Sequence, residues 1–116
     1  MTTIPLRGPK APGGRARKGT TRERMRPHAE AAADLLRALA NEQRLLVLCM
    51  LADAEMTVGE LNAALPLSQS ALSQHLAVLR ESGIVATRKE GLSVYYSMKP
   101  GPAARVVATL HAIYCG

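Results

Sequence analysis

The chain has 116 residues, which is enough for one folded domain and hardly enough for two. Apolar residues make up 47% and aromatic residues only 3%, so the core must consist of aliphatic side chains, which favours packed helices. No stretch approaches 18 apolar residues, and no apolar segment follows the basic N-terminus, so we expect neither a membrane span nor a secretory signal and predict a cytoplasmic protein.

The net charge of +6 is unevenly distributed along the chain. Residues 1–28 carry eight Lys and Arg against one acid, whereas residues 29–116 are close to neutral at −1. The basic segment is also rich in Pro and Gly, which predicts a flexible arm over 1–28 and a folded domain over 29–116. Such an arm is either a solubilising tail or a segment that follows DNA phosphates.

Four helices are predicted in the first part of the domain. Leucines at helical spacing indicate a helix over 30–40, and Asn41 is a suitable N-cap for a second over 42–52. Thr57 and Glu60 form the pattern of a capping box, which predicts a short helix to about residue 65. Ser68 caps a fourth helix over 69–82, and Gly83 is a natural stop.

Beyond Gly83 the apolar pattern alternates with a period of two. This predicts strands over 84–89 and 92–98, with a turn at Glu90 and Gly91. Pro102 suits the first turn of a last helix over 103–115. The predicted order α-α-α-α-β-β-α, mainly helical with a β-hairpin wing, is that of a winged helix-turn-helix domain.

The helix over 69–82 has the two faces that a DNA-reading helix needs. Leu72, Leu76 and Leu79 share one side, while small hydroxyl and amide side chains occupy the other, where they could meet base edges in a major groove. An ordinary solvated face would more often carry Lys and Glu. The basic hairpin tip would contact phosphates or a minor groove. The predicted DNA-binding residues are Ser68, Gln69, Ser70, Ser73, Gln74, His75, Arg88 and Lys89.

Three segments resemble the ArsR/SmtB family of bacterial winged-helix repressors: ALANEQRL, LSQSALSQHLAVLRESGIV and the Glu-Gly wing turn. The resemblance covers residues 33–115. It implies a homodimer whose first and last helices form the dimer interface, and binding to palindromic double-stranded operator DNA that ends when an inducer arrives. No phosphate-binding loop, nucleophile elbow or carboxylate pair suggests an enzyme. A protein-interaction module that uses the same fold without DNA is the alternative from a different class.

The family's two best-known metal sites have no counterpart here. The third helix contains no Cys-x-Cys, and the last helix offers His111 but no acid. We therefore expect no bound metal and no cofactor. A site built from Cys49, His111 and Cys115 is the nearest alternative for a metal sensor.

Cys49 and Cys115 match the two cysteine positions of the persulfide-sensing, BigR/SqrR-like branch of the family. That resemblance implies a dithiol repressor, released from DNA when a disulfide or polysulfide links the pair. Read alone, Cys49 is more often a buried core thiol, whereas Cys115 lies on an open face of small residues, off the apolar stripe that includes Leu110 and Ile113. A metal-responsive or general redox-responsive repressor remains the alternative.

Overall fold

The computed structural model describes residues 19–116. The described chain falls into two compact units that divide between Ala32 and Ala33. The predicted flexible arm over 1–28 lies largely outside the described residues, but its last part is helical. These residues form α1 (Thr21–Met25) and the 3₁₀ helix η2 (Arg26–His28), in which no residue is buried. A capping box begins α1: the Glu23 amide donates to the Thr20 hydroxyl, and the Thr20 amide donates to the Glu23 carboxylate.

The second unit contains the helices that the sequence predicts, with small shifts at their ends. They are α2 (Ala29–Leu39), of which residues 33–39 belong to this unit, α3 (Glu42–Asp53), α4 (Val58–Ala64), α5 (Gln69–Glu81) and α6 (Pro102–Tyr114). The caps fix their starts: the Asn41 side chain accepts from the amides of Gln43 and Arg44, and Ser68 accepts from the amide of Ala71. Thr57 and Glu60 form the expected capping box.

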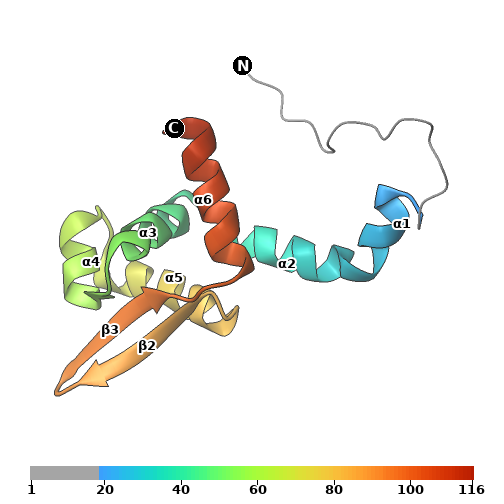
Figure 1. Cartoon of the computed structure of the whole chain (residues 1–116). Helices are drawn as coiled ribbons and strands as arrows, with labels where there is room; N and C mark the ends of the chain where they lie inside the picture. Colours follow the sequence, from blue (N-terminus) through green and yellow to red (C-terminus); the bar gives the residue numbers. More distant parts are fainter. Residues whose placement is uncertain (1–18) are drawn as a thin grey trace. The chain divides into compact units, whose positions relative to one another are not determined.

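The wing is part of a three-stranded antiparallel sheet. Strands β2 (Val85–Glu90) and β3 (Ser93–Met98) form the predicted hairpin, which extends away from the helices (Figure 1). Its turn lies one residue later than expected, at Gly91 and Leu92, with Gly91 at a φ of 63° that favours glycine. The two-residue strand β1 (Met56–Thr57), which the sequence does not predict, pairs with β3 and gives the order β1-β3-β2.

The core is aliphatic, as the composition requires. Leucines from α3, α4 and α5 pack together in the core, where they are joined by Ile84 and Val85 at the start of β2 and by Ala103 and Val107 of α6. Five leucines and one valine are almost completely inaccessible: Leu48, Leu61, Leu72, Leu76, Leu79 and Val47. Helix α5 is therefore held rigidly from one side. No helix among residues 19–116 is long and apolar enough to cross a membrane.

Candidate nucleic-acid interface and thiol pair

Helix α5 presents the polar face that the sequence predicts. Leu72, Leu76 and Leu79 are buried, and the side chains of Ser70, Ser73 and Gln74 are exposed on the remaining surface. The first turn of the helix is ordered by its own hydroxyls, since the Ser68 Oγ accepts from the Ala71 amide at 3.1 Å and lies 3.3 Å from the Ser70 Oγ. Gln69 is exposed beside them. This surface offers hydrogen-bond donors and acceptors on a firmly anchored helix.

His75 lies differently from its neighbours on α5. It is half-buried, and its Nδ1 is 3.4 Å from Nη1 of Arg44 on α3. The same guanidinium donates from Nε to the Ala38 carbonyl at 2.6 Å and from Nη2 to the Arg37 carbonyl at 3.1 Å. Arg44 therefore joins the end of α2, the start of α3 and the middle of α5. Sequence reasoning does not identify Arg44, because its partners are carbonyl groups and a residue 31 positions away.

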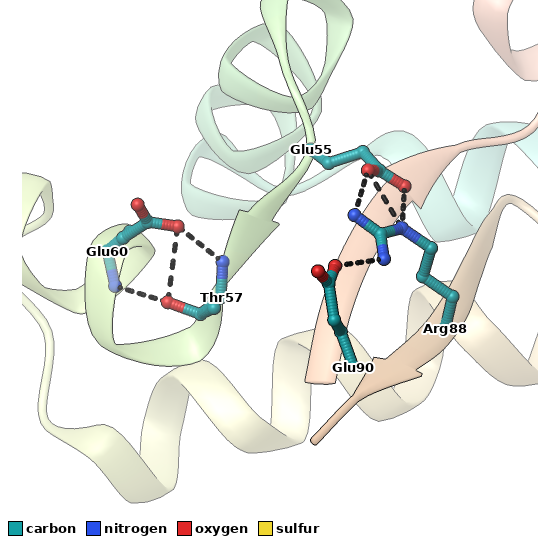
Figure 2. Close-up of polar contacts among 5 residues, drawn as sticks. All are labelled: Glu55, Thr57, Glu60, Arg88 and Glu90. Atoms are coloured by element: carbon teal, nitrogen blue, oxygen red, sulfur yellow. Dashed lines mark hydrogen bonds and ion pairs between the residues drawn. The ribbon is translucent and has the colours of Figure 1, made fainter. Parts of the chain in front are cut away.

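The wing carries a cluster of charged side chains on one face of the sheet. Arg88 donates from Nε to both carboxylate oxygens of Glu55 at 2.9 and 3.0 Å, and from Nη1 to Glu90 at 2.7 Å (Figure 2). Its guanidinium carbon also lies 4.7 Å from the centre of the Tyr95 ring. The hydrogen bonds from Arg88 lower the pKa of Glu55 below its ordinary value, and both carboxylates raise the pKa of Arg88.

Lys89, next to Arg88 in β2, points to the opposite face of the sheet because strand side chains alternate. It is exposed, and it has no ion-pair partner within residues 19–116. Val85 is on the same face as Lys89 and is buried in the core, and β2 contacts α5. Among the residues that the structure describes, the wing cation without an ion-pair partner therefore lies on the side of the sheet that packs against α5.

Both thiols are exposed in the protomer. The expectation that Cys49, read alone, is a buried core thiol is wrong: Val47 and Leu48 enter the core, while Cys49 follows them on the open side of α3. Cys115 is the C-cap of α6, and its amide donates to the His111 carbonyl at 2.7 Å. Helices α3 and α6 contact each other, so the two cysteines lie on adjoining helices.

The last helix leaves apolar surface uncovered. Pro102, Arg105, Val106, Thr109 and Leu110 line an open groove of about 390 Å³. The predicted apolar stripe is only partly buried within the protomer, because Ile113 and Tyr114 remain 42% and 81% exposed. Residues 19–116 contain no group of three or more His, Cys, Asp or Glu side chains arranged to hold a metal ion.

Comparisons with known proteins agree with this architecture. Residues 41–87 match the model of the bacterial regulatory protein, arsR family. The chain is 50% identical over 93 residues to the transcriptional activator HlyU of Vibrio cholerae, covering 80% of this chain and 86% of that protein. It is 46% identical over 91 residues to the biofilm growth-associated repressor of Agrobacterium fabrum, covering 78% of each.

Solved structures give the same result. The structure of reduced HlyU from Vibrio cholerae superposes with a TM-score of 0.75 at 49% identity, covering 81% of this chain and 99% of that one. The transcriptional repressor BigR from Xylella fastidiosa superposes with a TM-score of 0.73 at 42% identity, covering 82% and 94%. The winged-helix architecture and the family resemblance predicted from the sequence are both confirmed.

Proposed function

Because the chain belongs to the ArsR family of bacterial transcriptional regulators, we propose that it is a dithiol repressor of the persulfide-sensing kind. In this proposal it binds operator DNA in the cytoplasm as a homodimer. A sulfur bridge between Cys49 and Cys115 then releases it. The observation that carries the sensing proposal is the exposure of both thiols on helices that contact each other.

DNA recognition would use the exposed face of α5. Hydroxyl and amide side chains there can read base edges in the major groove, while Lys89 on the wing neutralises a phosphate. This face carries no Lys, Arg, Asp or Glu between Gln69 and Val78, so it contributes hydrogen bonds to DNA binding. The salt-dependent part of the DNA affinity must then come from basic residues outside this face. Ser70, Ser73 and Gln74 are the residues that we expect to set sequence preference.

A second copy of the chain would cover the apolar surface of the outer helices. Leu36 on α2 and Tyr114 on α6 are 57% and 81% exposed, and Pro102, Val106 and Leu110 contribute apolar side chains to the groove along α6. Burying these surfaces in a two-fold dimer would place two α5 helices about one DNA turn, ~34 Å, apart. Sedimentation analysis tests this step, and a monomer at micromolar concentration would contradict it.

The sensing chemistry balances with a persulfide as the only co-reactant. A cysteine thiolate attacks the terminal sulfur of R–S–SH, forms Cys–S–SH and expels R–S⁻. The second thiolate then attacks the inner sulfur of that persulfide, which closes a disulfide and expels HS⁻. If both cysteines are first converted to persulfides, attack of one terminal sulfur on the inner sulfur of the other gives a trisulfide and HS⁻.

The length of the bridge is a source of selectivity in this proposal. A direct disulfide needs Cα atoms within roughly 7 Å, and each additional sulfur extends the reach by about 2 Å. Two cysteines whose Cα atoms lie slightly beyond the limit for a disulfide could still be linked by a trisulfide after reaction with a persulfide. Peroxide could not oxidise the same pair directly to a disulfide. Mass spectrometry separates the two products, since they differ by one sulfur atom.

The decisive experiment compares wild type with Cys49→Ser and Cys115→Ser. A fluorescent duplex covering the region upstream of the protein's own gene is titrated before and after treatment with glutathione persulfide. Both variants should bind as tightly as wild type beforehand, and only wild type should be released. A coupling of about 1–3 kcal/mol between bridge and DNA would weaken binding about 5- to 150-fold.

Parallel arms separate the alternatives. Release of wild type by hydrogen peroxide as effectively as by persulfide indicates a general redox sensor. Release by Zn²⁺ at micromolar concentration, with the thiols reduced, indicates a metal sensor. Persulfide release of either serine variant places the trigger elsewhere. Absence of any salt-dependent DNA binding favours a protein-interaction module.

A further inference from the structure

We propose that Arg88 is a positioning residue that clasps the wing to the helix-turn-helix, and that Lys89 alone supplies the wing's phosphate contact. The inference rests on the proposed DNA-binding function, which it refines. The sequence suggests instead that both cations at the hairpin tip meet DNA.

The clasp spans all three strands. Arg88 on β2 is the cross-strand partner of Tyr95 on β3, and Tyr95 in turn pairs with Thr57 on β1. The guanidinium extends over the Tyr95 ring at 4.7 Å and reaches Glu55, which directly precedes β1, with its closest contact at 2.9 Å. An edge strand of the wing is thereby tied to the far strand of the sheet, across the strand between them.

The anchoring segment leads directly into the helix-turn-helix, which consists of α4 and α5. Glu55 lies two residues before Thr57, whose capping box with Glu60 begins α4 (Figure 2). Residues 55–57 therefore hold the wing through Glu55 and the first helix of the motif through Thr57. Movement of the wing relative to α4 requires these interactions to break.

The charge balance argues against Arg88 as a phosphate ligand. Its guanidinium already donates to two carboxylates, so a phosphate would have to displace an existing partner. The local sum of Arg88, Glu55 and Glu90 is −1, which repels a polyanion. Lys89 lies on the opposite face of β2, and no carboxylate of the described part of the chain forms an ion pair with it.

The test uses four single variants and one double variant of the full chain with the same upstream duplex, titrated from 50 to 300 mM salt. Arg88→Lys keeps the charge but cannot reach both carboxylates in a fork, so the clasp predicts a loss of affinity of about 2- to 5-fold, similar to that of Arg88→Gln. Neither changes the slope of log Kobs against log salt. Lys89→Gln, the matched control, makes that slope shallower by about 0.9 per phosphate that the lysine neutralises.

Glu55→Gln gives the sharpest distinction. Removing a negative charge near DNA would on its own tighten binding, but the clasp predicts weaker binding, with no further decrease in affinity when Arg88→Gln is added. The proposal is overturned if Glu55→Gln binds more tightly, if Arg88→Lys retains full affinity, or if Arg88→Gln lowers the salt slope.

A second readout does not depend on DNA. Backbone amides of β2 and β3 should exchange with deuterium several-fold faster in Glu55→Gln and Arg88→Lys than in wild type or Lys89→Gln. If wild type shows no salt-dependent DNA binding, the proposed function fails, and this measurement still decides the clasp. Unchanged exchange in both clasp variants refutes it.

Discussion

Replacing Arg44 with lysine tests the junction where three helices meet. The guanidinium donates to two carbonyls at the end of α2 and approaches His75 on α5. A helix leaves its last carbonyls without intrahelical partners, and here one side chain donates to two of them, although the Arg37 carbonyl also accepts from the Ala40 amide at 3.3 Å. Lysine has a single ammonium and cannot form the same fork.

The expected cost follows from the hydrogen bonds that lysine cannot form. Hydrogen bonds to charged groups contribute about 1.5–3 kcal/mol each, and lysine can retain one of the two bonds to the carbonyls. The bond to the Arg37 carbonyl is exposed, and that carbonyl keeps the Ala40 amide as a donor, so the loss falls at the low end of this range. We therefore expect Arg44→Lys to lower the free energy of unfolding by about 1–2 kcal/mol, which corresponds to a Tm decrease of ~5–15 °C in a domain of this size. This decrease is a substantial fraction of the stability of a small protein.

Thermal unfolding followed by circular dichroism at 222 nm measures this effect. All samples need the same protomer concentration, because the proposed dimerisation would make Tm depend on concentration. Arg80→Lys is the matched control, since Arg80 is exposed on α5 and forms no ion pair within residues 19–116. A Tm for Arg44→Lys within about 2 °C of that control would refute the role assigned to the fork.

Three further predictions concern α5, the glycine that follows it and the wing. Leu79→Ala should destabilise the protein by about 2–5 kcal/mol in denaturant unfolding, because Leu79 is fully buried. Val78→Ala, at an adjacent position that is 36% exposed, should cost far less, and equal effects would contradict the burial pattern. Gly83→Ala should cost about 1–2 kcal/mol purely from its φ of 73°, because an added Cβ meets no atom within 4 Å, and an unchanged Tm would refute this. In NMR titrations the Glu55 carboxyl should have a pKa below the ordinary Glu value in wild type, and this pKa should return towards the ordinary value in Arg88→Gln. The contribution of the clasp to stability is therefore present above the ordinary pKa of Glu and is lost as the pH falls through the lowered pKa. An identical Glu55 titration in both proteins would exclude the Arg88 contact in solution.

The parts of the fold that follow from local chemistry could be predicted from the sequence. Asn41, Thr57 and Ser68 mark helix starts because their side chains accept backbone hydrogen bonds, and the structure shows each doing so. Gly83 has the positive φ that ends α5. The short helix α1 carries a signal of the same kind, because the Thr20–Glu23 spacing is that of a capping box, whereas composition alone favours a flexible arm.

The remaining features depend on contacts between distant residues. Strand β1 is only two residues long, so no alternating pattern can reveal it without its pairing to β3. The exposure of Cys49 cannot be read from α3, whose apolar side chains surround the helix, so periodicity does not tell which side is buried. The ion pair of Arg88 with Glu55 arises from the sheet register and joins residues 33 positions apart.

The two-residue strand has a consequence for protein engineering. Since β1 contributes the third strand of the wing while lying between α3 and α4 in the chain, the hairpin is not a self-contained cassette. A chimera that imports residues 84–98 from another regulator would leave the recipient's residues 55–57 facing foreign neighbours. Exchanging both segments together is the design rule that this topology imposes.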